Sequence, residues 1–298
     1  MMTLKGIQAL LEKNEIKAYF NLEYVEFLKF LPLYLELPEQ AEYIDNLIQT
    51  FNINYHYHKF ESAFFNLHIL YMIIIYSYIL KLKNKNLEDF YMNLIRLDKH
   101  EVKKYQKKFK NKKIRLFDFS IFKEKNVFCF FKSLGISDKD LESLSQSVDE
   151  RNIYAHPRGR ILIKDSNELN VLIQKNIEAL EKIHSKMNTK VCSLFISFID
   201  ENIGDFEEEL REIDKLKTEL EMEKDDKKIE NIKLYINKMN KIFGEKFRDL
   251  FIQKNYLNQM DVLDCLNIEI DIYCGKLSRF DDKKKLFIKF KEIFSEEN

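Results

Sequence analysis

The chain has 298 residues, of which 45% are hydrophobic, so it can bury a sizeable core in one large domain or two modest ones. It has only six glycines, three prolines and no tryptophan. This composition argues against an all-β or doubly wound fold, because such folds need turn residues at short intervals. Lys plus Arg and Asp plus Glu balance at 49 each, so the net charge points to neither an acidic nor a basic partner. We therefore predict an all-α protein.

Apolar residues recur at three- and four-residue spacing along the first half of the chain. The second helix should bend or stop at Pro32 and Pro38. Gly135 is placed to cap the helix before it, and Ser137 to cap the helix after it. The predicted helices span residues 4–14, 19–37, 39–50, 60–82, 86–110, 119–134 and 138–155.

Residues 62–80 contain no charged side chain, over about the length that crosses a bilayer. The segment also carries Asn66, His68 and Ser77, and a helix packed on all sides in a soluble bundle is hydrophobic all round too. We expect a buried core helix, with a membrane span as the alternative. His68 and Asn66 should be hydrogen-bonded core residues, or should support a functional site above them.

Charge is unevenly distributed along the chain. Residues 99–115 hold nine basic residues and one acid, whereas residues 200–226 hold thirteen acids and four bases. With Tyr105 and Phe109 between its lysines, the basic stretch predicts a phosphate-binding helix face with base stacking. A plain solvated face is the alternative. The lysines that we expect to contact RNA are Lys103, Lys104, Lys107 and Lys108.

The second half of the chain has a helical pattern that ends in a predicted extension. Residues 167–202 predict one long amphipathic helix, and coiled-coil spacing then continues over 206–220 and 229–243, interrupted by EMEKDDKK. This pattern predicts an antiparallel helical hairpin. We place a domain boundary at residue 190, between a helical bundle (1–190) and an acidic extension (191–298).

The sequence predicts no metal site and no cofactor. His56 and His58 have a spacing that can chelate a metal, but no Cys, Asp or Glu set completes a site. No phosphate-binding glycine loop or nucleophile elbow is present in the sequence. The widely spaced cysteines and the absence of a secretory signal pattern predict a cytoplasmic protein. The cysteines are Cys129, Cys192, Cys265 and Cys274.

The helical pattern breaks at SVDERNIYAHPRGRILI, residues 147–163. A residue before proline avoids the helical conformation, so the helix should end at or before His156 and present the imidazole on its last turn. On a helical wheel Arg151 and His156 flank a buried stripe centred on Val148. Three residues within about 40° complete that stripe: Leu141, Leu144 and Ala155.

This pair of side chains suits one chemistry. An imidazole with a pKa of about 6.5 can move a proton, and a guanidinium can hold a phosphate bidentately. If the histidine takes a proton from a ribose 2′-OH, that oxygen can attack the adjacent phosphate without a metal. DNA, which lacks this hydroxyl, would be inert.

Arg151, Asn152 and His156, in the form RNIYAH at a helix end, resemble the R-x4-6-H motif of the HEPN superfamily, in which a polar residue commonly follows the arginine. Followed by PRGRI, the form resembles that of many prokaryotic defence and toxin HEPN ribonucleases. The resemblance covers about residues 60–190. Some members also have a glutamate five residues before the arginine and a lysine directly before it. Here these positions hold Gln146 and Glu150, so we expect no acidic third catalytic residue.

HEPN ribonucleases assemble their active site from two motifs that face each other across a domain pair, and this chain has one. The resemblance therefore implies a homodimer in which Arg151 and His156 of each protomer line a shared cleft, with Asn152 orienting the pair. Arg158 and Arg160 would grip flanking phosphates, or they are ordinary solvated charges.

The resemblance thus implies a metal-independent endoribonuclease that cuts single-stranded or loop RNA and leaves a cyclic phosphate, acting as a toxin or phage-defence effector. An antitoxin, a guide RNA, another defence-system subunit or the acidic extension itself would restrain it. Two other classes stay open: a non-catalytic α-helical module that binds RNA or a protein, and a structural interaction protein built on the hairpin.

Overall fold

The computed structural model describes residues 21–33, 35–85, 87–109, 113–155, 163–253 and 257–267. Within these ranges the chain forms helices and connecting turns and no β-strand, apart from an isolated bridge between Pro32 and Asn258. The predicted all-α class is confirmed. The expected helix at 4–14 lies outside the described residues.

The chain divides into two compact units, which we describe separately. Unit 1 comprises residues 1–187 and 255–260, and unit 2 comprises residues 188–254 and 261–298. The proposed division into a functional domain and an extension at residue 190 stays a prediction. In chain order the elements are α2 (Leu22–Leu28), α3 (Pro38–His56), α4 (Phe60–Lys85), α5 (Leu87–Ile95), α6 (Lys99–Phe109), the 3-10 segments η1 (Leu116–Ile121) and η2 (Asn126–Leu134), α7 (Asp138–Ala155), α8 (Ser166–Met222), α9 (Asp226–Phe247), the π segment η3 (Arg248–Gln253) and α10 (Gln259–Asn267).

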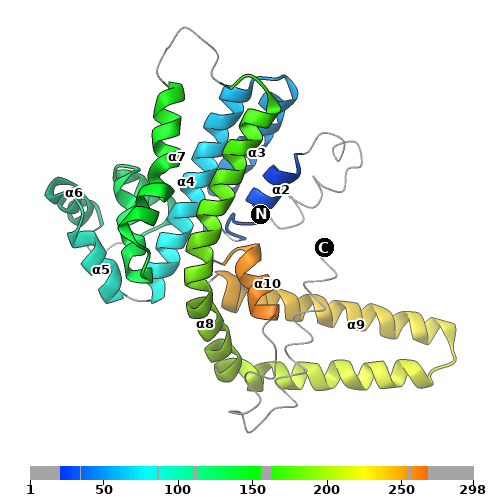
Figure 1. Ribbon diagram of the computed structural model, residues 1–298. Helices are drawn as coiled ribbons and strands as arrows, with labels where there is room; N and C mark the ends of the chain where they lie inside the picture. The colour runs from blue at the N-terminus through cyan, green and yellow to red at the C-terminus, as the bar shows by residue number, and fades with distance from the viewer. Residues whose placement is uncertain are drawn as a thin grey trace. The chain divides into compact units, whose positions relative to one another are not determined.

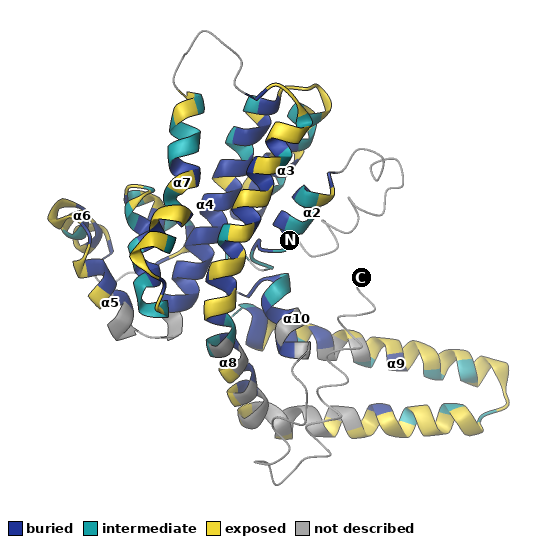
Figure 2. Cartoon of the chain, in the orientation of Figure 1, coloured by how far each residue is buried: buried dark blue, intermediate teal, exposed yellow. Residues whose placement is uncertain are grey.

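Helix α4 forms the centre of unit 1. Every residue from 70 to 82 is buried, and α3, α7 and the first part of α8 lie around it (Figures 1 and 2). By length and composition the segment Phe60–Lys83 could also cross a membrane. However, 83% of its most apolar 18-residue stretch is buried inside the protein, and one such helix is weak evidence for a membrane span. Its hydrophobicity is accounted for by packing in the core.

The polar groups of α4 are hydrogen-bonded within unit 1. The Ser77 hydroxyl donates to the Ile74 carbonyl at 2.7 Å, and the Tyr78 hydroxyl lies 3.2 Å from Nδ1 of His184 on α8. The Asn258 amide donates to the same Tyr78 oxygen at 3.3 Å. These bonds remove the cost of burying polar atoms, and they tie α8 and residue 258 to the central helix.

Two predicted helices differ from the observed ones, because one ends earlier and the other is divided. Helix α2 stops at Leu28 rather than at a proline, and Phe30 and Leu31 turn into the core. Pro32 then forms the isolated bridge with Asn258, and the Leu33 N–H donates to the Leu257 carbonyl at 3.0 Å. The predicted helix 86–110 is two helices, because Asp98 caps α6 by accepting a 2.8 Å bond from the His100 N–H.

The predicted helix 119–134 is wrong. The chain forms η1 and η2 instead, and residues 122–125 separate them. A buried carboxylate, Glu101 of α6, makes this break: its two oxygens accept hydrogen bonds from the Lys123 N–H and the Asn126 amide, each at 2.6 Å. A tertiary contact therefore interrupts a segment whose local pattern is helical.

Helix α7 begins where the sequence predicts. Gly135 adopts a left-handed conformation with φ of 73°, which ends η2 and which a residue with a Cβ adopts only with strain. The Ser137 hydroxyl then accepts a 3.2 Å bond from the Asp140 N–H, as an N-cap does. The start of α7 is therefore encoded locally.

In unit 2, α8 continues through Gly204 to Met222 as one helix, beyond the predicted end at residue 202. Helix α9 runs back in the opposite direction, so the predicted hairpin forms (Figure 1). Asp225 caps α9 by accepting bonds from the Lys227 and Lys228 N–H groups. Aromatic rings close the base of the hairpin: Phe195, Phe198, Phe247 and Phe251.

Candidate functional site

The last two turns of α7 carry the first two residues of the predicted site. Arg151 and Asn152 are both half-buried, as expected from their places beside the apolar stripe. Ala155, which we expected within the stripe, is exposed, so burial of α7 fades toward its end. Three predicted site residues lie outside the described residues: His156, Arg158 and Arg160.

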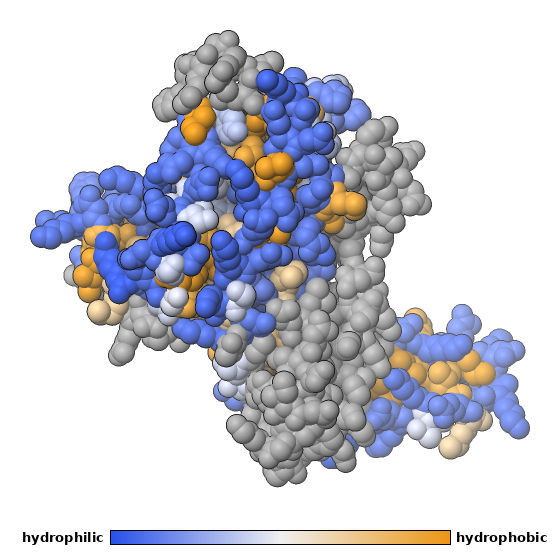
Figure 3. All heavy atoms as spheres, viewed as in Figure 1, coloured by the Kyte–Doolittle hydropathy of each residue, from blue (hydrophilic) through white to orange (hydrophobic). Residues whose placement is uncertain are grey.

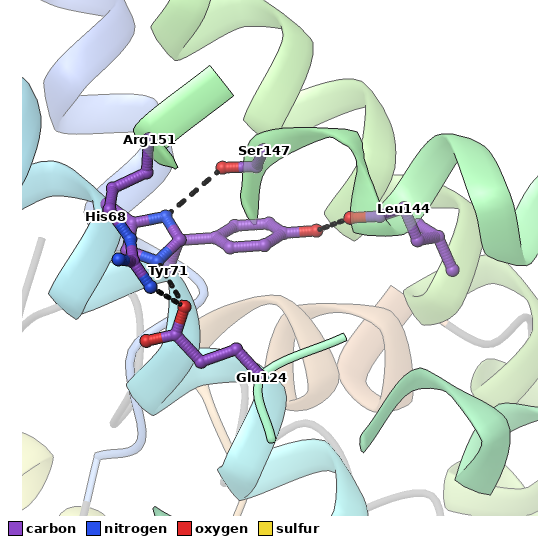
Figure 4. A network of polar contacts seen from close by, with 6 residues as sticks. All are labelled: His68, Tyr71, Glu124, Leu144, Ser147 and Arg151. Atoms are coloured by element: carbon purple, nitrogen blue, oxygen red, sulfur yellow. Dashed lines mark hydrogen bonds and ion pairs between the residues drawn. The ribbon is translucent and has the colours of Figure 1, made fainter. Parts of the chain in front are cut away.

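Arg151 lies in a network of polar contacts drawn in Figure 4. Its Nη2 donates to Oε2 of Glu124, which lies in the turn between η1 and η2. The same carboxylate oxygen lies 3.2 Å from Nε2 of His68 on α4. One glutamate thus joins the motif helix to the central helix.

His68 is buried, and both of its ring nitrogens face polar atoms. Nδ1 lies 3.5 Å from the Ser147 hydroxyl, at the long end of the hydrogen-bond range. Because a carboxylate only accepts, the arrangement is satisfied when Nε2 carries the proton and Nδ1 accepts from Ser147. The Tyr71 hydroxyl, one turn further along α4, donates to the Leu144 carbonyl at 2.9 Å (Figure 4). Of the two roles left open for His68, the structure shows a hydrogen-bonded core residue, which reaches the motif arginine only through Glu124; its support of a functional site stays a prediction.

Glu124 is an ionised group held by its donors. The hydrogen bond with His68 and the hydrogen bond with Arg151 lower the pKa of this carboxyl to about 2, against the opposing effect of partial burial. The side chain is 32% exposed and that of Arg151 is 29% exposed, so the pair lies at the surface of the core rather than inside it. Glu124 therefore stays ionised at neutral pH.

Three consecutive residues of α7 form ion pairs with other parts of unit 1. Asp149 pairs with Lys125 of the turn, Glu150 pairs with Lys175 of α8 at 2.8 Å, and Arg151 pairs with Glu124. One turn later the ring of Tyr154 packs edge-on against Phe64 of α4, with centroids 5.0 Å apart. These contacts fix the orientation of α7 just before the position of His156.

The lysines of α6 lie on one exposed face. Hydrophilic side chains cover this helix in Figure 3, while apolar side chains gather beside it over α5, where Met92 and Ile95 are exposed. Tyr105 and Phe109 are buried in the core, so the expectation that they stack on bases is wrong. What remains is an exposed face of four lysines, whose binding of phosphates stays a prediction: Lys103, Lys104, Lys107 and Lys108.

The other candidate positions form no site. His56 is the last residue of α3, and His58 lies in the turn after it with φ of 56°, not on the strand that metal chelation by this pair would use. Within the described residues no group of three or more His, Cys, Asp or Glu side chains could hold a metal. Cys129 is a half-buried thiol packed against the core, and this burial raises its pKa to about 11.

Glu124 is the residue that the sequence does not reveal. It lies 27 positions before Arg151 in FKEKN, where no spacing marks it. His68 did carry a signal, as a polar residue in a long apolar run. Within the described residues no hydrogen bond to another side chain fixes Asn152, whose predicted orienting role stays a prediction.

No protein-family model matches the chain, and neither a curated protein nor a solved structure matches it. The fold and the site define the protein only as an all-α protein in which Arg151, near the end of α7, is paired with Glu124.

Proposed function

We propose that this protein is a metal-independent endoribonuclease of the HEPN type, working in the cytoplasm as a toxin or phage-defence effector. The observation that carries the proposal is the state of Arg151. It is a held, partly exposed guanidinium on the last turns of α7, five positions before His156, and not a freely solvated charge. The all-α body around α4 is consistent with the same family.

In the proposed reaction the His156 imidazole takes the proton from a ribose 2′-OH. The 2′ oxygen forms a bond to the adjacent phosphorus, and the bond from phosphorus to the 5′ oxygen breaks. The leaving oxygen takes up a proton, so the products are a 2′,3′-cyclic phosphate and a 5′-hydroxyl. Arg151 stabilises the negative charge that develops on the phosphate oxygens. Asn152, Arg158 and Arg160 are assigned supporting contacts to the motif and to flanking phosphates.

One motif per chain leads us to propose a homodimer with a composite active site, because HEPN ribonucleases assemble their active site from two such motifs. A restraining partner would be an antitoxin, a guide RNA or another defence-system subunit. The protein should purify from the soluble fraction without detergent, because α4 is packed inside unit 1. Extraction only with detergent would contradict the cytoplasmic assignment.

The test compares the wild-type protein with His156→Ala on an RNA oligonucleotide in EDTA. We expect the cleavage rate to fall at least about 100-fold in the variant, which is the usual contribution of a general base. His100→Ala, an exposed histidine on α6, is the matched control and should cut at the wild-type rate. An oligonucleotide with 2′-deoxyribose at the cleaved position should stay intact.

Equal cleavage by wild type and His156→Ala would refute the catalytic role of the motif. Loss of cleavage in EDTA would refute the metal-free mechanism, and a strictly monomeric yet active protein would refute the composite site.

A second function, non-catalytic RNA binding, is favoured by the exposed lysine face of α6, which needs no histidine. It predicts RNA binding by the wild type and by His156→Ala alike, with no cleavage by either protein.

A further inference from the structure

Glu124 is the only carboxylate that contacts the Arg151 guanidinium within the described residues. The contact is made through Nη2 alone. A guanidinium has five N–H donors, so most of them stay available to another acceptor, and the side chain is partly exposed. Glu124 therefore holds the arginine from one side without occupying the edge that would meet a phosphate.

The turn that carries Glu124 is itself held from two sides. Toward α6, the Lys123 N–H and the Asn126 side chain both donate to the buried carboxylate of Glu101. Toward α7, Lys125 pairs with Asp149. Each residue from 123 to 126 thus contacts a helix, which fixes the backbone from which the Glu124 side chain projects.

The second contact of Glu124 fixes which way its carboxylate faces. His68 is buried on α4, the central helix of unit 1, and its Nε2 lies 3.2 Å from the oxygen that also accepts from Arg151. The carboxylate cannot rotate toward solvent without losing both partners. Arg151 is consequently held by a group that is fixed to the core.

We propose that Glu124 is a positioning residue for the cleavage reaction, which holds the Arg151 guanidinium in the orientation that meets the scissile phosphate. The assignment rests on the proposed endoribonuclease function. An arginine side chain has many rotamers, and one that is oriented before RNA binds loses less freedom when it contacts the phosphate. Glu124 acts through Arg151 and touches neither the ribose nor the phosphate.

The experiment measures kcat and KM for RNA cleavage by Glu124→Ala and Glu124→Gln. We expect kcat to fall about 10- to 100-fold in Glu124→Ala, with KM changed less than about threefold, because misplacing a group by about an ångström costs rate and not affinity. Glu124→Gln should recover part of the loss, since its amide oxygen still accepts from Arg151 but carries no charge.

Lys125→Ala is the matched control, because it removes the neighbouring ion pair between the same turn and α7 and leaves Arg151 untouched. It should keep the wild-type kcat. A double-mutant cycle with Arg151→Ala gives a second readout: in that background Glu124→Ala should cause no further loss of kcat if Glu124 acts through the arginine. If Glu124→Ala does not fold, Glu124→Gln carries both measurements.

Wild-type kcat in both Glu124 variants would overturn this assignment and leave the ribonuclease function standing. So would a loss of kcat in Lys125→Ala equal to that in Glu124→Ala, since the turn's fold and not the carboxylate would then be responsible. A wild-type protein that binds but never cuts RNA would overturn the ribonuclease function and this assignment together.

Discussion

Arg151 and the lysines of α6 are both cationic parts of unit 1, but they are held in opposite ways. Arg151 is half-buried and fixed by Glu124, whereas Lys103, Lys104, Lys107 and Lys108 are exposed on a helix whose apolar face anchors it. A fixed charge can direct a reaction at one phosphate. Mobile charges attract a polyanion without choosing a position on it. The comparison predicts that the two regions affect different kinetic constants.

The largest expected effect is on the reaction rate. Arg151→Ala should lower the single-turnover cleavage rate about 100- to 1000-fold, as the loss of a group that stabilises developing charge does. Arg151→Lys keeps the charge but loses the planar fork, so it should recover only part of the rate. Arg96→Lys, an exposed arginine on the turn after α5, is the matched control. Wild-type rates in Arg151→Lys would contradict the comparison, because charge alone would then be enough.

The second effect is on affinity. Replacing the four α6 lysines by glutamine should weaken RNA binding about tenfold or more at low salt and leave the rate at saturating RNA nearly unchanged. Each lost phosphate contact lowers the salt dependence by about 0.7 for a single strand, so the slope should fall by about 2 to 3. Fluorescence anisotropy at several salt concentrations measures both quantities. An unchanged slope would mean that α6 is a solvated face.

The third effect is on stability at low pH. The pKa of Glu124 is lowered by His68 and Arg151 to about 2 in the folded state, below its unfolded value. Its ionised form therefore stabilises the fold above about pH 4.5, and this contribution is lost as the pH falls toward 2. After allowance for partial exposure, Glu124→Gln should lower the free energy of unfolding at pH 7 by about 1 to 2 kcal/mol. Urea titrations should show the difference disappearing near pH 2, and a difference independent of pH would refute the pairing.

The smallest effect concerns the start of α7. Gly135→Ala should destabilise the protein by about 1 kcal/mol, because alanine is strained in the left-handed conformation that ends η2. Gly204→Ala is a matched change inside α8 that meets no neighbouring atom, and it should stabilise by about 0.5 to 1 kcal/mol. Thermal denaturation of both variants tests the pair, and a stabilising Gly135→Ala would contradict the assigned cap.

Local patterns predicted the elements whose ends are set by local chemistry. The Gly135 and Ser137 caps, the apolar run of α4 and the interruption before α9 were all readable in the sequence, because each depends on neighbours within a turn or two. Prediction was wrong where a distant side chain intervened. Glu101 divides the segment 119–134 into two 3-10 segments, and no pattern within 119–134 predicts this break.

In the candidate site too, the sequence predicted the local features and missed the contacts between distant residues. The sequence placed Arg151 beside the buried stripe of α7 and singled out His68 as a polar residue in an apolar helix. It gave no sign that the two share a partner. Base stacking by Tyr105 and Phe109 was a reasonable reading of alternating lysines and aromatics, but burial of both rings excludes it.

The sequence by itself determined an all-α chain, its central apolar helix and the position of Arg151 near the end of α7, since hydrophobic periodicity and capping act over a few residues. Only the tertiary structure decided what holds that arginine. Glu124 lies 27 residues from Arg151 and 56 from His68, and the three meet because α4, α7 and the turn after η1 pack against one core. Contacts between side chains so far apart in sequence are set by packing, which no local spacing encodes.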